Sequence, residues 1–142
     1  MSSPGYVLSL DVGERRVGVA IASVIARLPA PLTTIDRTKV ADVYAEVAKL
    51  VAAHEAGAVV IGLPRGLSGQ ETAQTSAARG FAAELAGLVD VPIVMQDEAG
   101  TSLEAERLLK ARGKAYKKGD IDAEAAALIL RDYLQQARNH SA

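Results

Sequence analysis

The sequence contains no cysteine and no tryptophan, and it has only two histidines among its 142 residues. The absence of cysteine excludes disulfides, thiolate nucleophiles and cysteine-based zinc sites, and it is typical of a reducing compartment. The histidines are His54 and His140, one at a predicted helix end and one in the tail. Such positions argue against histidine acid–base or triad chemistry. Aromatic residues make up only 4% of the chain, so aliphatic residues and alanine must fill the core.

Long apolar runs and an excess of one charge are also absent. No apolar run approaches the ~20 residues that a membrane span needs, and residues 1–5 do not begin a signal peptide. We therefore expect a cytoplasmic protein without a membrane partner. Sixteen basic and seventeen acidic residues give a net charge of −1, which argues against a protein coated in basic residues for duplex binding. The length predicts one domain over residues 1–142, with a frayed tail at 138–142.

Hydrophobic patterning predicts three strands followed by alternating helices and strands. The predicted strands cover residues 7–10, 17–21, 32–35, 58–61 and 93–96, and the predicted helices cover residues 40–54, 71–88, 101–113 and about 120–138. A capping box at Thr101–Glu104 is expected to open the third helix. This order indicates an α/β fold in which helices cover both faces of a mixed sheet, with the opening hairpin as its antiparallel part.

Three acidic residues stand at the ends of predicted elements. Asp11 ends the first strand, Glu98 follows the last strand, and Asp122 opens the last helix on the same stripe as Ala126 and Ile129. Three neighbouring carboxylates would repel one another, and a hard divalent cation such as Mg²⁺ or Mn²⁺ removes that conflict. Such ions activate water and stabilise the charge that develops on a phosphate. The structural alternatives are a turn-forming Asp11 and an Asp122 that only complements the helix dipole.

Two further segments could contact phosphates. The glycine-rich loop Gly62–Gly69, which contains Arg65, follows a buried strand, where open α/β sheets tend to bind ligands. A basic segment without acids runs from Arg107 to Lys118. Its candidate nucleic-acid contacts are Lys110, Arg112, Lys114, Lys117 and Lys118. The alternatives are a plain connecting loop and a solvated helix end.

Four motifs in this order resemble the YqgF/RuvX family of ribonuclease H-like nucleases, which are described as pre-16S rRNA nucleases or Holliday junction resolvases. The resemblance covers nearly the whole chain. The matching residues are Asp11-Val12-Gly13 with Arg16–Ala20, Gly62-Leu63-Pro64 with Gly69 and Phe81, Asp97-Glu98 with Thr101, and Ile121-Asp122 with Ala125-Ala126.

The resemblance implies a ribonuclease H-like fold with a five-stranded sheet and a catalytic, metal-binding triad of Asp11, Glu98 and Asp122. The implied activity is metal-dependent hydrolysis of phosphodiester bonds, with processing of the 5′ end of pre-16S rRNA as its role. Its partner would be nucleic acid, RNA rather than DNA, and the protein would be a monomer or a homodimer. The family usually has arginine directly after the glutamate, whereas Ala99 stands here. We expect Arg65 or the basic segment to replace that contact.

Three other functions remain open. One is resolution of DNA junctions, which needs two active sites and hence a symmetric dimer. A second is a nucleic-acid-binding module with weakened catalysis, which Ala99 suggests. The third is an ATP site of the actin and sugar-kinase type, which also opens on a strand with Asp-x-Gly. The chain is too short for the second lobe that those enzymes need, so this function ranks last.

Overall fold

The computed structural model describes residues 5–140, with side chains described through residue 137. Within these residues, one five-stranded sheet has the order β3-β2-β1-β4-β5 and is accompanied by four helices. The strands are β1 (Tyr6–Val12), β2 (Arg16–Ser23), β3 (Ala30–Asp36), β4 (Ala56–Pro64) and β5 (Ile93–Glu98). The helices are α1 (Val43–Ala53), α2 (Ala73–Ala86), α3 (Thr101–Ala111) and α4 (Lys118–His140). The predicted order of elements is confirmed.

The sheet is mixed, as the sequence predicts. Strands β1, β2 and β3 pair antiparallel, whereas β4 lies parallel to both β1 and β5. The carboxyl ends of β1, β4 and β5 therefore meet at one edge of the sheet. The β1–β2 turn is tight, with the Gly13 N–H donating to the Arg16 carbonyl at 2.9 Å. Pro31 lies in the edge strand β3, where a missing N–H leaves no gap in the sheet.

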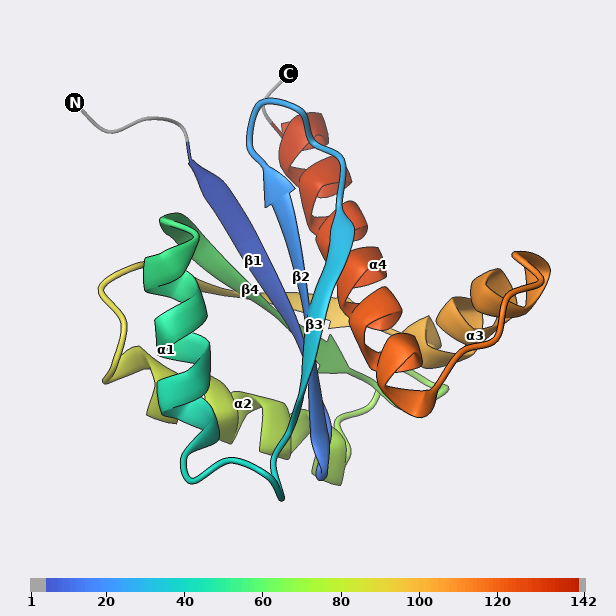
Figure 1. The fold of residues 1–142 in the computed structure, drawn as a ribbon, viewed down its shortest axis with the longest axis horizontal. Helices are drawn as coiled ribbons and strands as arrows, with labels where there is room; N and C mark the ends of the chain where they lie inside the picture. The colour runs from blue at the N-terminus through green and yellow to red at the C-terminus, as the bar shows by residue number, and fades with distance from the viewer. Residues whose placement is uncertain (1–4, 141–142) are drawn as a thin grey trace.

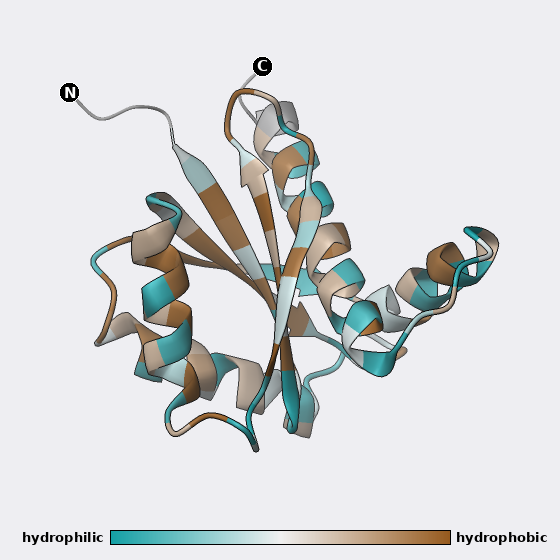
Figure 2. Ribbon diagram, in the orientation of Figure 1, coloured by the Kyte–Doolittle hydropathy of each residue, from teal (hydrophilic) through white to brown (hydrophobic). Residues whose placement is uncertain are grey.

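Helices cover both faces of the sheet, which gives two apolar cores. Helices α1 and α2 lie on one side and α4 on the other (Figure 1). Figure 2 shows apolar residues along the strands between these layers. On the α1/α2 side, Val47, Phe81 and Leu85 pack on aliphatic residues of the sheet. On the α4 side, Ile129 and Leu130 pack on Val60 and small residues of β2.

Helix α4 lies unusually close to the sheet because the residues beneath it are small. A Cβ on Gly18 would lie 1.9 Å from the carbonyl oxygen of Asp122, and a Cβ on Gly62 would lie 2.4 Å from Ile129 Cδ1. The buried Ser9 hydroxyl donates to the Ala126 carbonyl at 2.6 Å and ties β1 to the middle of the helix. These contacts fix the height and register of α4, and therefore the position of its acidic side chains.

Several predicted boundaries are wrong. No side-chain cap opens α3, because Gly100 in the left-handed conformation (φ 72°) occupies the cap position and Thr101 is already helical. The capping box instead opens α2, where Thr72 and Thr75 cap each other. Helix α1 begins at Val43, after its cap Asp42.

The last helix also differs from its predicted limits. It extends to His140, so residues 138–140 of the predicted frayed tail belong to α4, and residues 141–142 lie outside the described part. Its start at Lys118 places Asp120, rather than Asp122, in the first turn. None of the helices in residues 5–140 is long and apolar enough to span a membrane.

Candidate active site

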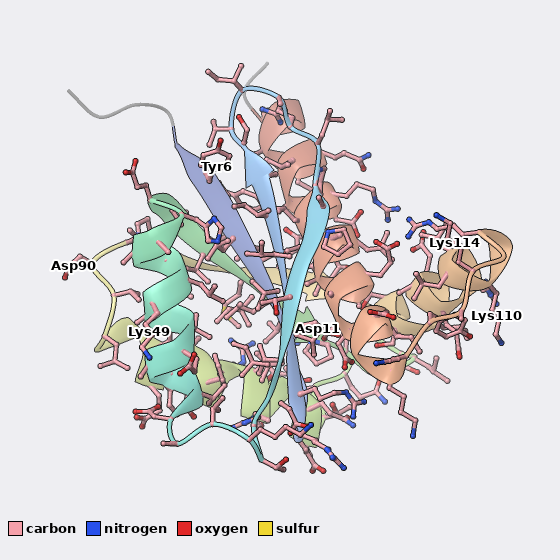
Figure 3. All side chains as sticks on the ribbon, viewed as in Figure 1. Tyr6, Asp11, Lys49, Asp90, Lys110 and Lys114 are labelled. Carbon is pink, nitrogen blue, oxygen red and sulfur yellow. The ribbon has the colours of Figure 1, made fainter. Side chains whose placement is uncertain are left out.

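A cavity opens at the sheet edge where the carboxyl ends of β1, β4 and β5 meet. Its volume is about 160 Å³, which admits several water-sized groups. The lining residues include Asp11, Gly62, Pro64, Arg65, Glu98, Ala99, Thr101 and Ile129. Figure 3 shows Asp11 at the centre of the molecule, beside the sheet. The structure thus brings two of the three predicted acids, Asp11 and Glu98, to one cavity.

Asp11 lies near the carboxyl end of β1, and this position brings its side chain to the cavity. Its neighbour on β2 is Gly18, over which α4 passes. Burial raises the pKa of Asp11 to about 6, and the nearby Asp122 carboxylate contributes to the rise. Burial and a like charge both disfavour the ionised form of Asp11. A cation bound beside Asp11 would favour the ionised form and so offset that cost.

Glu98 is the last residue of β5 and lies opposite Pro64 of β4. Its Oε1 atom is buried and has no hydrogen-bond partner among the described residues. Burial raises the pKa of Glu98 to about 9, and the carboxyl group of Asp132 adds to the rise through a hydrogen bond and its charge. A buried, unpartnered carboxylate oxygen is costly and points to a ligand.

Asp132 is an acidic neighbour that the sequence analysis missed. It lies on α4, three residues after Ile129, which lines the cavity. The sequence did contain a signal for this position, because Asp132 is three residues after Ile129 and residues three apart share a helix face. The neighbouring Arg131 contacts it, with 3.0 Å between Arg131 Nη2 and Asp132 Oδ1.

Asp122 faces Asp11 closely enough to affect its pKa but is bonded elsewhere. Arg16 Nε donates to Asp122 Oδ2 at 2.5 Å, so this carboxylate already has a cationic partner. In the described part of the chain, no group of three acidic, histidine or cysteine residues lies close enough to hold a metal ion. The triad of Asp11, Glu98 and Asp122 therefore stays a prediction.

Comparison with known proteins shows the family. The family model described as "RuvX: Holliday junction resolvase" matches residues 5–136 of this chain. The chain belongs to the RuvX family. A RuvX relative from Chloroflexus aggregans, named "Putative pre-16S rRNA nuclease", is 44% identical over 135 residues, which cover 94% of this chain and 95% of that protein. A relative of the same name from Roseiflexus is 37% identical and covers 96% of this chain and 99% of its own length.

Solved structures show the fold of this RuvX protein. The Thermus thermophilus RuvC structure in complex with a Holliday junction has a TM-score of 0.60 and 17% identity, covering 94% of this chain and 96% of that one. The fowlpox virus resolvase with its junction DNA has a TM-score of 0.57 and 14% identity, covering 93% and 98%. The predicted ribonuclease H-like fold is confirmed.

The predicted basic contacts of this RuvX protein are dispersed over its surface. Arg65 lines the acidic cavity beside Ala99, where Asp97 holds it at 3.1 Å and Glu71 at 3.5 Å. Arg112 instead pairs with the buried Glu124, with 2.5 Å between Arg112 Nη1 and Glu124 Oε1.

The remaining lysines of the basic segment separate into two places. Lys110 and Lys114 lie at the outer end of α3, away from Asp11 (Figure 3). Lys117 lines a different groove, together with Arg16, and Lys118 is the first residue of α4. The segment therefore does not form a single surface at the cavity.

The donor set of the cavity fits a divalent cation in part. Asp11 and Glu98 offer carboxylate oxygens, which Mg²⁺ and Mn²⁺ prefer, and one oxygen of Glu98 lacks any partner in the described structure. Asp122 Oδ2 accepts from Arg16, and a carboxylate has a second oxygen that can bind a cation while that bond is kept. The fit therefore rests on Asp11 and Glu98, with Asp122 near Asp11 as the third candidate ligand.

Proposed function

We propose that this RuvX protein is a metal-dependent nuclease that hydrolyses phosphodiester bonds of nucleic acid. The observation that carries the proposal is the convergence of Asp11 and Glu98 on one cavity, with a buried Glu98 oxygen that lacks a partner among the described residues. Both residues are half-buried at this cavity, where the partial burial of a carboxylate without a partner costs free energy. They are suited to holding a cation at the end of a sheet, where open α/β sheets bind ligands.

Each residue of the site has a defined role in this proposal. Asp11, Glu98 and Asp122 would hold Mg²⁺ or Mn²⁺, which supplies activation of water and stabilisation of charge on the phosphate. Arg16 neutralises Asp122 while the carboxylate has no other partner.

Arg65 is the cationic side chain among the residues that line this cavity, and it offers planar N–H donors to a phosphate oxygen. Its contacts with Asp97 and Glu71 hold the guanidinium in place at the rim. We propose that it supplies the contact that Ala99 cannot make.

We further propose that the substrate is RNA, at the 5′ end of pre-16S rRNA. The support is the name of the two relatives, which match at 37–44% identity over nearly the full chain. The chain's near-neutral net charge of −1 suits recognition by a few local contacts rather than a broad basic surface. We expect the protein to act in the cytoplasm.

A second candidate function is resolution of DNA junctions. It is favoured by the structural likeness to two resolvases whose structures hold junction DNA. That activity requires two active sites and hence a symmetric dimer. Sedimentation at working concentration distinguishes the candidates, because a protein that stays monomeric with junction DNA cannot make paired cuts. Binding of RNA without cleavage would instead indicate a binding module.

The test is a cleavage assay on single-stranded RNA carrying a pre-16S 5′ leader, single-stranded DNA and a four-way junction, each with Mg²⁺, Mn²⁺ or a chelator. We expect metal-dependent cleavage of the RNA, and loss of cleavage in Asp11→Asn and Glu98→Gln. The matched control is Asp90→Asn, an exposed residue on the opposite side of the molecule (Figure 3). Full activity of Asp11→Asn, or equal activity with the chelator, would refute the proposal.

A further inference from the structure

A second groove lies between the edge strand β3 and the start of α4. Its lining residues are Arg16, Pro31, Leu32, Thr33, Thr34, Asp36, Lys39, Lys117, Gly119, Asp120 and Ala123. Three of them are cationic and come from separate segments. Arg16 begins β2, Lys39 follows β3, and Lys117 precedes α4. The fold, rather than a run of sequence, gathers these charges.

Three cationic side chains line the groove against two acidic ones, and both of these carboxylates accept hydrogen bonds. Asp36 accepts from the N–H and hydroxyl of Thr38 at 3.0 and 2.6 Å. It also lies 3.6 Å from Arg15, and the hydrogen bonds from Thr38 together with the charges of Arg15 and Lys39 hold the pKa of Asp36 below its ordinary value. Asp120 accepts from the Lys117 N–H at 2.8 Å.

The two lysines of the groove are held less closely, although the charge of Lys39 does act on Asp36. Lys39 and Lys117 are exposed, and neither ammonium forms an ion pair with another residue that the structure describes. An exposed ammonium that is not bound in an ion pair attracts mobile anions, and phosphates along a nucleic-acid strand are such anions.

The walls of the groove are held together by a hydrogen bond across it. The Thr34 hydroxyl of β3 donates to the Gly119 carbonyl of α4 at 2.6 Å. Gly119 has no side chain, and a Cβ there would already contact Thr34. The strand and the helix start are therefore fixed relative to each other, so a ligand meets a preformed surface.

Arg16 connects this groove to the acidic cavity. Its side chain lines the groove, and its Nε atom donates to Asp122. The negative charge of Asp122 is close enough to Asp11 to raise the pKa of that residue. A guanidinium has five N–H donors, and the described structure gives Arg16 one side-chain hydrogen bond. The other donors are available to a phosphate next to the acidic site.

We infer that this groove binds the phosphodiester backbone of the substrate strand next to the cleavage site, through Lys39, Lys117 and Arg16. The inference rests on the proposed function, because it assumes a nucleic-acid strand at the acidic cavity. It assigns the basic contacts to this groove and not to the outer end of α3. The ligand chemistry is a row of phosphates, and base identity plays no part in it.

The test measures binding of fluorescein-labelled single-stranded RNA by anisotropy over a series of salt concentrations, in the Asp11→Asn background so that the strand stays intact. The groove variant is Lys39→Ala with Lys117→Ala. We expect its affinity to fall about tenfold and the slope of log K against log salt to decrease by about 1.4, since each phosphate contact on a single strand contributes about 0.7. With Asp11 present, KM should rise while kcat stays close to the parent value.

Two further variants complete the design. Lys49→Ala removes an exposed positive charge from α1, on the other face of the sheet, and should leave binding unchanged. Lys110→Ala with Lys114→Ala tests the outer end of α3. The inference is overturned if the groove pair binds like the parent, or if only the α3 pair weakens binding.

The outcomes also separate this inference from the proposed function. Normal cleavage with unchanged binding in the groove pair refutes the groove alone. Weakened binding in the groove pair, with cleavage that survives Asp11→Asn, refutes the acidic site and leaves the groove. A parent protein that neither binds nor cuts RNA, DNA or a junction refutes both.

Discussion

Replacing Gly18 by alanine tests whether the close approach of α4 positions the acidic site. The added Cβ would lie 1.9 Å from the Asp122 carbonyl oxygen and 2.8 Å from the Ala123 nitrogen. These are backbone atoms, so the helix itself must withdraw by about 1 Å or more to restore ordinary contact distances. Overpacking of this kind costs about 3 kcal/mol, which corresponds to a fall in Tm of about 10 °C in a domain of this size.

The measurement is urea unfolding of Gly18→Ala beside Gly80→Ala. Gly80 lies within α2, and a Cβ there meets nothing within 4 Å, so alanine should stabilise that helix by about 0.5–1 kcal/mol. The Gly18 variant should also have a lower pKa at Asp11, measured by NMR, because Asp122 moves away from it. A Gly18→Ala protein as stable as the parent, with an unchanged Asp11 pKa, would refute this account of the site.

Two other predictions follow from buried polar groups. The pKa of Asp11 is raised to about 6 from an ordinary 3.8, so ionisation of Asp11 lowers the stability of the folded protein as pH rises through that range. Below pH 3.8 the carboxyl group is protonated in both states and this loss is absent. Asp11→Asn should therefore raise the free energy of unfolding by about 3 kcal/mol at pH 7.5 and leave it unchanged at pH 3.5. An equal effect at both pH values would contradict the assignment. Thr75→Val should cost about 2 kcal/mol in thermal or urea unfolding, because the buried Thr75 hydroxyl donates to the Pro64 carbonyl and caps α2. The exposed Ser76→Ala is its control, and a cost no larger than that of the control would count against the bond.

Local sequence was enough to predict the order of elements and the sheet. Alternating apolar residues in the opening hairpin and β-branched runs such as Ala58–Ile61 set strand and helix by their periodicity. The placement of Asp11 and Glu98 at one end of the sheet followed from this order, because parallel strands bring their carboxyl ends together. Boundaries were less predictable. Gly100 replaced the expected cap at Thr101, since a left-handed residue can begin a helix without a side-chain bond.

The partners of the charged side chains were decided by the tertiary structure. Arg16 and Asp122 are 106 residues apart in the sequence, yet they form an ion pair. Arg112, expected to contact nucleic acid, instead neutralises the buried Glu124. Electrostatic interactions act through space, so no spacing along the chain predicts such pairs.

The sequence by itself therefore determined which elements form, because periodicity and backbone preference act over a few residues. Only the tertiary structure decided which charges meet. Packing of α4 on Gly18 sets where Asp122 and Lys117 lie relative to β2 and β3. That packing depends on how residues far apart in the chain fit together, and a fit in three dimensions has no counterpart in local sequence.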